Sequence, residues 1–232
     1  MSSIIKYLRL ETYEDALNNL AFKDKAPSPD QKDFSRDFML NYWLNFETKG
    51  SPSLLNIEQF ADPVAYTLQV KKPGTDEYVE KAVDLVETFN WLIGLHVEHL
   101  DRWRSYDASF KREEDLELPE DSNTRLILDG NLKETEKGAW RLRKIEGYTL
   151  LTPGDKSDRE RVLVIWRKLT GDLEQDNLVL DEWFRKYRLS THDSEFDVIY
   201  VNGSNNLPNL RQAEETWKVR LIEEAFHQAM WD

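Results

Sequence analysis

Hydrophobic positions in the first third of the chain follow two different spacings. Residues 4–10 have strand composition, and Thr12 with the acids after it resembles a capping box that opens a helix. A polar stretch with two prolines, residues 23–32, predicts an exposed loop. A second helix, closed by Gly50, is predicted where aromatic residues recur every four positions: Phe34, Phe38, Tyr42 and Phe46.

The next segment predicts a strand at Tyr66 to Val70 and a hairpin or loop over residues 71–77. Apolar residues then recur at helical spacing, which predicts the longest helix of the chain over roughly 78–100. Its apolar face would comprise Val79, Ala82, Val83, Val86, Phe89, Leu92 and Ile93. The acidic stretch 111–124 is expected to be a loop or an insertion.

The last 110 or so residues alternate between extended and helical patterns. Strands are predicted at 124–130, 139–152, 161–169 and 195–203, and helices at 172–187 and 215–231. Between Val162 and Val201 the order strand, helix, strand predicts a β-α-β crossover with parallel pairing. The predicted fold class is α/β, with a mixed sheet, flanking helices and one domain over residues 1–232. A subdivision into a helix-rich part (1–104) and a sheet-rich part (105–232) is the second interpretation.

Composition sets limits on this picture. With 232 residues, 40% of them hydrophobic, and eight tryptophans, the chain can fill a sizeable core. It has no cysteine, which excludes disulfides, zinc thiolate sites and thiol nucleophiles. No run of about 18 apolar residues is present, and the start does not look like a signal peptide. We therefore expect a soluble, cytoplasmic protein without a membrane segment.

The net charge of −13 argues against a surface that is basic all over, as in many nucleic-acid-binding domains. Charge is segregated, however, because residues 111–136 carry nine acids and four bases, whereas residues 140–168 carry eight bases and four acids. This basic segment, with Trp140, Tyr148 and Trp166 interleaved, is the candidate for a nucleic-acid contact. A solvated surface or ion pairing with the acidic stretch is the competing interpretation.

Other candidate sites have weaker support. The nine glycines form no G-x-G pattern, so Gly171 is interpreted as a turn residue before a helix capped by Asp172, not as part of a phosphate-binding loop. His96 and His99 have a spacing that can share a metal on a helix, but a solvated helix end is favoured. The E-x-K spacing at Glu47 to Lys49 occurs in some nucleases, yet here it is predicted to end a helix.

Six blocks of the sequence look like the C-terminal region of the adenine-specific DNA methyltransferases of type III restriction-modification systems, the modification subunit. They occur in family order and cover most of the chain, with residues 103–161 matching least well. The blocks are IIKYLRLETYEDALNNL, ETKGSPSLLNIEQFADPVAYTLQV, VDLVETFNWLIGL, VLVIWRKLTGDLEQDNLVLDEWF, FDVIYVNGSNNL and ETWKVRLIEEAFHQAMWD.

The resemblance implies an accessory domain that does not catalyse the reaction on its own. The family binds S-adenosylmethionine through an F-x-G-x-G loop and positions the target amino group with D-P-P-Y, and the sequence has neither. The stretch Asp62 to Tyr66 has an extra residue between proline and tyrosine, which the geometry of that loop would not tolerate. No catalytic, cofactor-binding or metal-binding residue is therefore predicted here. The chain is expected to be a separate domain or fragment that follows the catalytic half.

The implied partners are the methyltransferase catalytic half, a second copy in a homodimer, the restriction subunit and DNA. The residues predicted to contact DNA backbone are Arg141, Arg143, Lys144, Arg161 and Arg167. Two hypotheses of other classes are kept beside this one. A free-standing metal-dependent nuclease or phosphoesterase would use acids such as Asp129, Glu195 and Asp197, the last two on one side of a strand. A pure protein-interaction module would make no DNA contact.

Overall fold

The computed structural model describes residues 60–72, 74–114, 123–211 and 217–231. The chain divides into two compact units, one containing residues 65–83 and the other containing residues 60–64 and 84–232. The elements predicted at 4–10, after Thr12 and at 34–46 lie outside the described residues, as does Glu47 to Lys49. The suggested division near residue 104 stays a prediction.

The described part of the first unit is a β-hairpin. Strands β1 (Thr67–Lys71) and β2 (Tyr78–Ala82) pair antiparallel, with Thr67 opposite Ala82. Lys72 makes two contacts with Glu77 across the turn. Its backbone N–H donates to the Glu77 carbonyl (2.9 Å), and its ammonium group pairs with the Glu77 carboxylate (2.7 Å). The predicted strand at 66–70 and the hairpin after it are confirmed.

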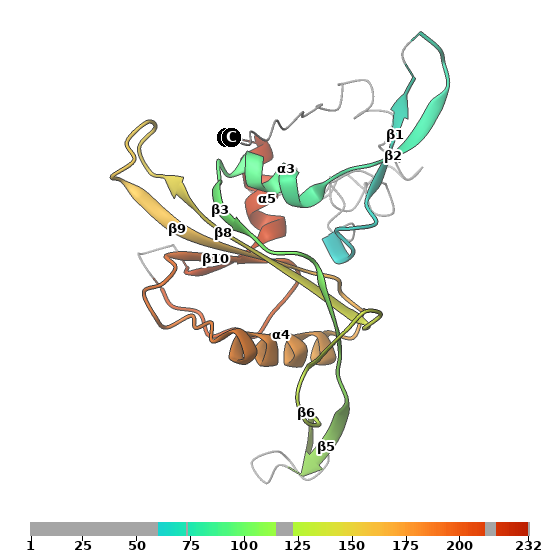
Figure 1. Cartoon of the computed structure of the whole chain (residues 1–232), viewed down its shortest axis with the longest axis vertical. Coiled ribbons are helices and arrows are strands. Elements are labelled where there is room, and N and C mark those ends of the chain that lie inside the picture. Colours follow the sequence, from blue (N-terminus) through green and yellow to red (C-terminus); the bar gives the residue numbers. More distant parts are fainter. Residues whose placement is uncertain (1–59, 73, 115–122, 212–216, 232) are drawn as a thin grey trace, which may run out of the picture. The chain divides into compact units, whose positions relative to one another are not determined.

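The second unit is built on a mixed seven-stranded sheet (Figure 1). Strand β10 pairs parallel with β9 and β11, and the other strand pairs in the sheet are antiparallel. The strand order is β11 (Val219–Leu221), β10 (Val198–Val201), β9 (Arg159–Arg167), β8 (Trp140–Leu150), β4 (Arg104–Asp107) and β7 (Lys133–Thr135), with β3 (His96–Leu100) pairing with β8 beside β4. The predicted mixed sheet and the parallel pairing of the β-α-β unit are confirmed.

Helices cover both faces of this sheet, which explains why β9 and β10 are continuous apolar runs (Figure 1). On one face, Leu163 and Ile165 belong to a core cluster with α4 (Leu173–Tyr187). On the other face, Trp166 packs edge to face against Phe89 of α3 (Leu85–Leu92), with 5.9 Å between ring centroids. Helix α5 (Ile222–Trp231) lies on the same side as α3, since its Phe226 stacks with Phe89.

Helix α4 begins and ends where the sequence predicts. The Asp172 carboxylate accepts the Gln175 N–H at 3.1 Å and caps the first turn, and Gly171 before it has a φ of +95°. The helix ends at Tyr187 and is capped by Arg188, which adopts the left-handed conformation with φ of +54°. The helix prediction and the interpretation of Gly171 as a turn residue are confirmed.

A second hairpin, β5 (Phe110–Glu114) with β6 (Thr124–Leu128), extends away from the large sheet (Figure 1). Its base is anchored by Phe110, whose ring lies 5.4 Å from that of Trp140. Of the two alternatives for 111–124, a loop is wrong for Lys111 to Glu114, which form a strand, whereas a hairpin that extends from the sheet agrees with an insertion; residues 115–122 lie outside the described residues. Glutamate is a poor strand former, but cross-strand pairing overrides this propensity.

The predicted helix over 78–100 is wrong for most of its length. Only residues 85–92 are helical, because Asp84 caps the N-terminus and Gly94, with φ of +65°, reverses the chain. The flanking segments pair as β2 and β3. Strand β3 approaches β8 closely because Gly147 has no side chain: a Cβ there would lie 2.3 Å from the His96 carbonyl oxygen.

Two further predicted elements are shorter than expected. The strand predicted at 195–203 comprises only residues 198–201. Within the helix predicted at 215–231, residues 219–221 instead form strand β11, which pairs with β10 before α5 begins. Among the described residues, no helix is both long enough and apolar enough to cross a bilayer.

Candidate nucleic-acid interface

The five basic residues predicted to contact nucleic acid lie on β8 and β9, on opposite faces of the sheet. Successive side chains of a strand point to opposite faces, and directly opposed residues of paired strands share a face. Arg141 and Arg143 therefore lie on one face and Lys144 on the other. Arg161 and Arg167 are in register with residues on the face of Lys144. The structure thus brings Arg141 and Arg143 together and separates them from the other three.

Arg167 is part of the core. Its side chain is 2% exposed, and burial lowers the pKa of the guanidinium to about 10, so the group stays charged at neutral pH. All five of its N–H donors are used. The acceptors are the carbonyls of Asn202 (2.9 Å), Asp176 (3.2 Å), Gly203 (3.2 Å) and Ser204 (2.7 Å) and the Asn177 amide oxygen (3.2 Å). Arg167 has no surface to offer a phosphate, and the prediction that it contacts DNA is wrong for this structure.

Lys144 and Arg161 are engaged in other contacts. The Lys144 ammonium pairs with the Glu146 carboxylate, and it also lies 6.0 Å from the centroid of the Tyr187 ring. The Arg161 guanidinium is exposed and lies over the Phe196 ring at 5.5 Å. For these two residues a DNA contact stays a prediction.

Arg141 and Arg143 lie over the ring of a tryptophan that the sequence analysis did not single out. Their guanidinium carbons lie 5.8 Å and 5.9 Å from the ring centroid of Trp103, which stands in the joint between β3 and β4. Neither arginine has a carboxylate partner among the described residues. The Nε atom of Arg141 is buried and has no hydrogen-bond partner within the described ranges, whereas that of Arg143 donates to the Asp101 carbonyl at 2.8 Å. We call Trp103, Arg141 and Arg143 the arginine–tryptophan patch.

Asp101 fixes the joint that carries Trp103. Its carboxylate accepts the Arg102 N–H at 2.9 Å and a guanidinium N–H of Arg104 at 3.4 Å. Burial alone would raise the pKa of Asp101, but these hydrogen bonds and the nearby positive charges hold it below the usual value. Arg104 also pairs with Glu134 at 3.2 Å, so Asp101 and Glu134 are both occupied by a cation other than Arg141 and Arg143.

A pocket of about 520 Å³ adjoins the patch at the edge of the sheet, where β7 ends beside β4. Its volume falls in the range of about 300–1,000 Å³ that is usual for ligand sites. Trp103 forms part of the wall. The complete lining is Arg102, Trp103, Arg104, Ser105, Glu134, Thr135 and Glu136.

The aromatic residues expected to lie beside the basic segment do not line this surface. Trp166 is 0% exposed and Trp140 is 8% exposed, and both pack in the core. Tyr148 stacks on His96, with 4.9 Å between ring centroids. Only the tripeptide Arg102-Trp103-Arg104 could have pointed to the patch, and it lies outside the basic segment.

The histidine and carboxylate candidates that the sequence analysis weighed do not form a site within the described residues. His96 and His99 lie on a strand, not on a helix. Asp197 precedes β10 and accepts the Arg161 N–H at 2.7 Å, so the prediction that Glu195 and Asp197 share one side of a strand is wrong. Asp129 follows β6, 3.9 Å from the Lys111 ammonium. Within the described ranges, no group of three or more acids and histidines could hold a metal ion.

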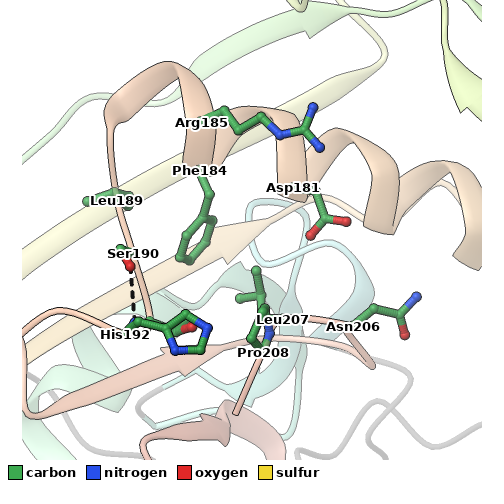
Figure 2. A pocket seen from close by; sticks show the side chains of 10 residues that line it. Asp181, Phe184, Arg185, Leu189, Ser190, His192, Asn206, Leu207 and Pro208 are labelled. Atoms are coloured by element: carbon green, nitrogen blue, oxygen red, sulfur yellow. Dashed lines mark hydrogen bonds between the residues drawn. The ribbon is translucent and has the colours of Figure 1, made fainter. Parts of the chain in front are cut away.

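A second pocket, of about 370 Å³, lies beside the C-terminal half of α4 (Figure 2). The helix contributes Asp181, whose pKa is raised by burial, and Arg185. The opposite wall includes His192, whose backbone N–H donates to the Ser190 hydroxyl at 3.0 Å. In the described part of the chain the His192 ring has no hydrogen bond to another lining side chain, so no nucleophile and base are paired here.

Comparisons with protein-family models, with curated proteins and with solved structures found no significant match to this chain.

Proposed function

We propose that this chain is the C-terminal accessory domain of a type III-like, site-specific N6-adenine DNA methyltransferase. On this proposal it does not catalyse methyl transfer, and S-adenosylmethionine is held by the catalytic half. The domain contributes to assembly, by docking to that half, to a second copy or to the restriction subunit, and it contacts DNA through the arginine–tryptophan patch. The support for the family and for assembly is the resemblance of the sequence blocks.

The observation that carries the DNA contact is the pair Arg141 and Arg143. Two guanidinium groups on the same face of one strand, without carboxylate partners among the described residues, are suited to phosphate oxygens, which accept bidentate hydrogen bonds from arginine. Strand β8 is a rigid support, since it pairs with β9 on one side and with β3 and β4 on the other. The groups are therefore held in place before any ligand arrives.

Two phosphate contacts make a limited contribution to affinity. Each releases counterions, so two lower the slope of log K against log salt by about 1.8. The net charge of −13 opposes binding to DNA elsewhere on the surface. We therefore expect the domain alone to bind duplex DNA weakly and to add to the affinity of a larger assembly.

The test is duplex binding by fluorescence anisotropy over a series of salt concentrations. The variant Arg141→Gln/Arg143→Gln is compared with Lys144→Gln/Arg161→Gln, which removes the same charge from the opposite face of the sheet. We expect the first variant to lose nearly all of the salt-dependent binding and the second to keep most of it. Equal losses would show that only net charge matters. No binding by the unmodified chain would leave a pure protein-interaction module.

A further inference from the structure

We propose that the pocket beside Trp103 accepts an unpaired nucleobase, which stacks on the indole while Arg141 and Arg143 hold the adjoining phosphate. This inference rests on the proposed function, because it names the part of a nucleic acid that the same patch recognises. It adds to phosphate binding a preference for single-stranded or locally opened DNA.

The first support is the combination of a tryptophan with two guanidinium groups. The guanidinium carbons lie over the ring, 5.8 Å and 5.9 Å from its centroid, so a phosphate bound by them adjoins the ring, and a base would stack on the part of the ring that they leave open. Nonspecific single-strand sites pair aromatic platforms with positive charge in this manner, because every base presents a flat face and every linkage carries a charge. In a duplex the faces of the bases are covered by their neighbours, so the ring would find no partner there.

The second support is the lining of the pocket. Trp103 provides a flat apolar wall and Ser105 a hydroxyl group that can donate or accept hydrogen bonds, while the Thr135 hydroxyl donates to the Asp107 carboxylate at 3.0 Å and can still accept. Glu136 adds a carboxylate, which can accept from the amino group of a base, while the Glu134 carboxylate is paired with Arg102 and Arg104. The lining has two arginines, Arg102 and Arg104, beside the two glutamates, so the pocket itself has no net charge and does not favour an acidic peptide over a neutral base.

The third support is that the ring is held in position. Asp101 bonds to Arg102, Arg104 and Arg143 at once, so the backbone on both sides of Trp103 is tied to β8. The turn between β7 and β8 also packs tightly against strand β4, because a Cβ at Gly138 would lie 2.3 Å from the Tyr106 backbone. A platform fixed in this way loses little conformational entropy when a base stacks on it.

The experiment measures the binding of three labelled DNAs by fluorescence anisotropy: a 12-nucleotide single strand, the same strand with abasic sites in its centre, and the matching duplex. The variants are Trp103→Ala and Trp103→Phe, with Trp91→Ala as the control, since Trp91 is 55% exposed on α3. We expect Trp103→Ala to weaken binding of the normal strand by roughly tenfold. Binding of the abasic strand and the salt slope should not change. Trp103→Phe should keep most of the affinity, and Trp91→Ala all of it.

Three results would overturn the inference. Equal affinity of the unmodified chain for normal and abasic strands would remove the stacking contact but leave the phosphate contact of the proposed function intact. Equal weakening of both strands by Trp103→Ala would make Trp103 a support for the arginines. Competition by polyglutamate as effective as that by the single strand would point to a protein partner. If no DNA binds at all, the proposed contact fails as well. Thermal denaturation of each variant checks that it is folded, and Trp103→Phe keeps a ring if Trp103→Ala unfolds.

Discussion

Replacing Arg167 by methionine should destabilise the second unit strongly. The side chain joins the ends of β9 and β10 to the first turn of α4 through five hydrogen bonds, and its removal leaves the acceptors behind. Methionine has a similar length and no donor. The loss in the free energy of unfolding can therefore be worked out from the number of acceptors that water cannot reach.

Two of the five acceptors, the carbonyls of Gly203 and Ser204, are only partly buried and can bind water after the substitution. The other three are buried: the carbonyls of Asn202 and Asp176 and the amide oxygen of Asn177. A net value of about 1–1.5 kcal/mol for each buried bond gives a loss of about 3–5 kcal/mol in the free energy of unfolding. Removing a buried cation returns part of this amount, so we expect about 3 kcal/mol.

The assay is urea and thermal denaturation of the full chain, followed by far-ultraviolet circular dichroism and tryptophan fluorescence. A loss of about 3 kcal/mol corresponds to a fall of roughly 6–12 °C in Tm for a unit of this size. The control is Arg185→Met, because Arg185 is 77% exposed and pairs with Glu182 at the surface, where such pairs contribute about 0–1 kcal/mol. Arg167→Lys keeps the charge but has three donors in place of five, and should fall between the two. If Arg167→Met stays within about 1 kcal/mol of Arg185→Met, the five bonds do not hold these elements together.

Three other substitutions test separate features of the second unit. Burial raises the pKa of Glu223 above its ordinary value of 4.5, so stability should fall as pH rises from 4.5 through the raised value, and Glu223→Gln should remove that slope from chemical denaturation curves measured across this range. Asn90 is 2% exposed and both polar atoms of its amide lack hydrogen-bond partners in the described part of the chain, so Asn90→Leu should raise the free energy of unfolding by about 1–2 kcal/mol; a decrease would mean that the amide is used. Gly147→Ala should lower Tm by several degrees and speed hydrogen exchange in β3, because the added methyl group would meet the His96 carbonyl; unchanged exchange in β3 would contradict this contact.

The sequence by itself determined the elements in which the hydrophobic pattern and the capping residues indicate the same structure. Helix α4 has an apolar stripe, an aspartate cap and a glycine before it, and β9 is a continuous apolar run. Their order also predicted the parallel pairing of β9 with β10, because a strand that returns after a helix tends to pair in that direction.

Tertiary structure decided the segments whose hydrophobic spacing or composition predicts one element but whose backbone pairs as another. Residues 78–82 and 96–100 carry a helix-like spacing but pair as strands, since pairing with β1 and β8 satisfies their backbone groups. The carboxylates of residues 111–114 suggested a loop, yet this segment pairs with β6.

Tertiary structure also decided which residues form the candidate interface. The sequence determined that basic residues cluster between positions 141 and 168, but charge along a chain does not reveal which face of a sheet each side chain occupies. Alternation along β8 separates Arg143 from Lys144, and burial removes Arg167 from the surface. Trp103 joins the patch only because β4 pairs with β8, which brings together residues some 40 positions apart in the chain.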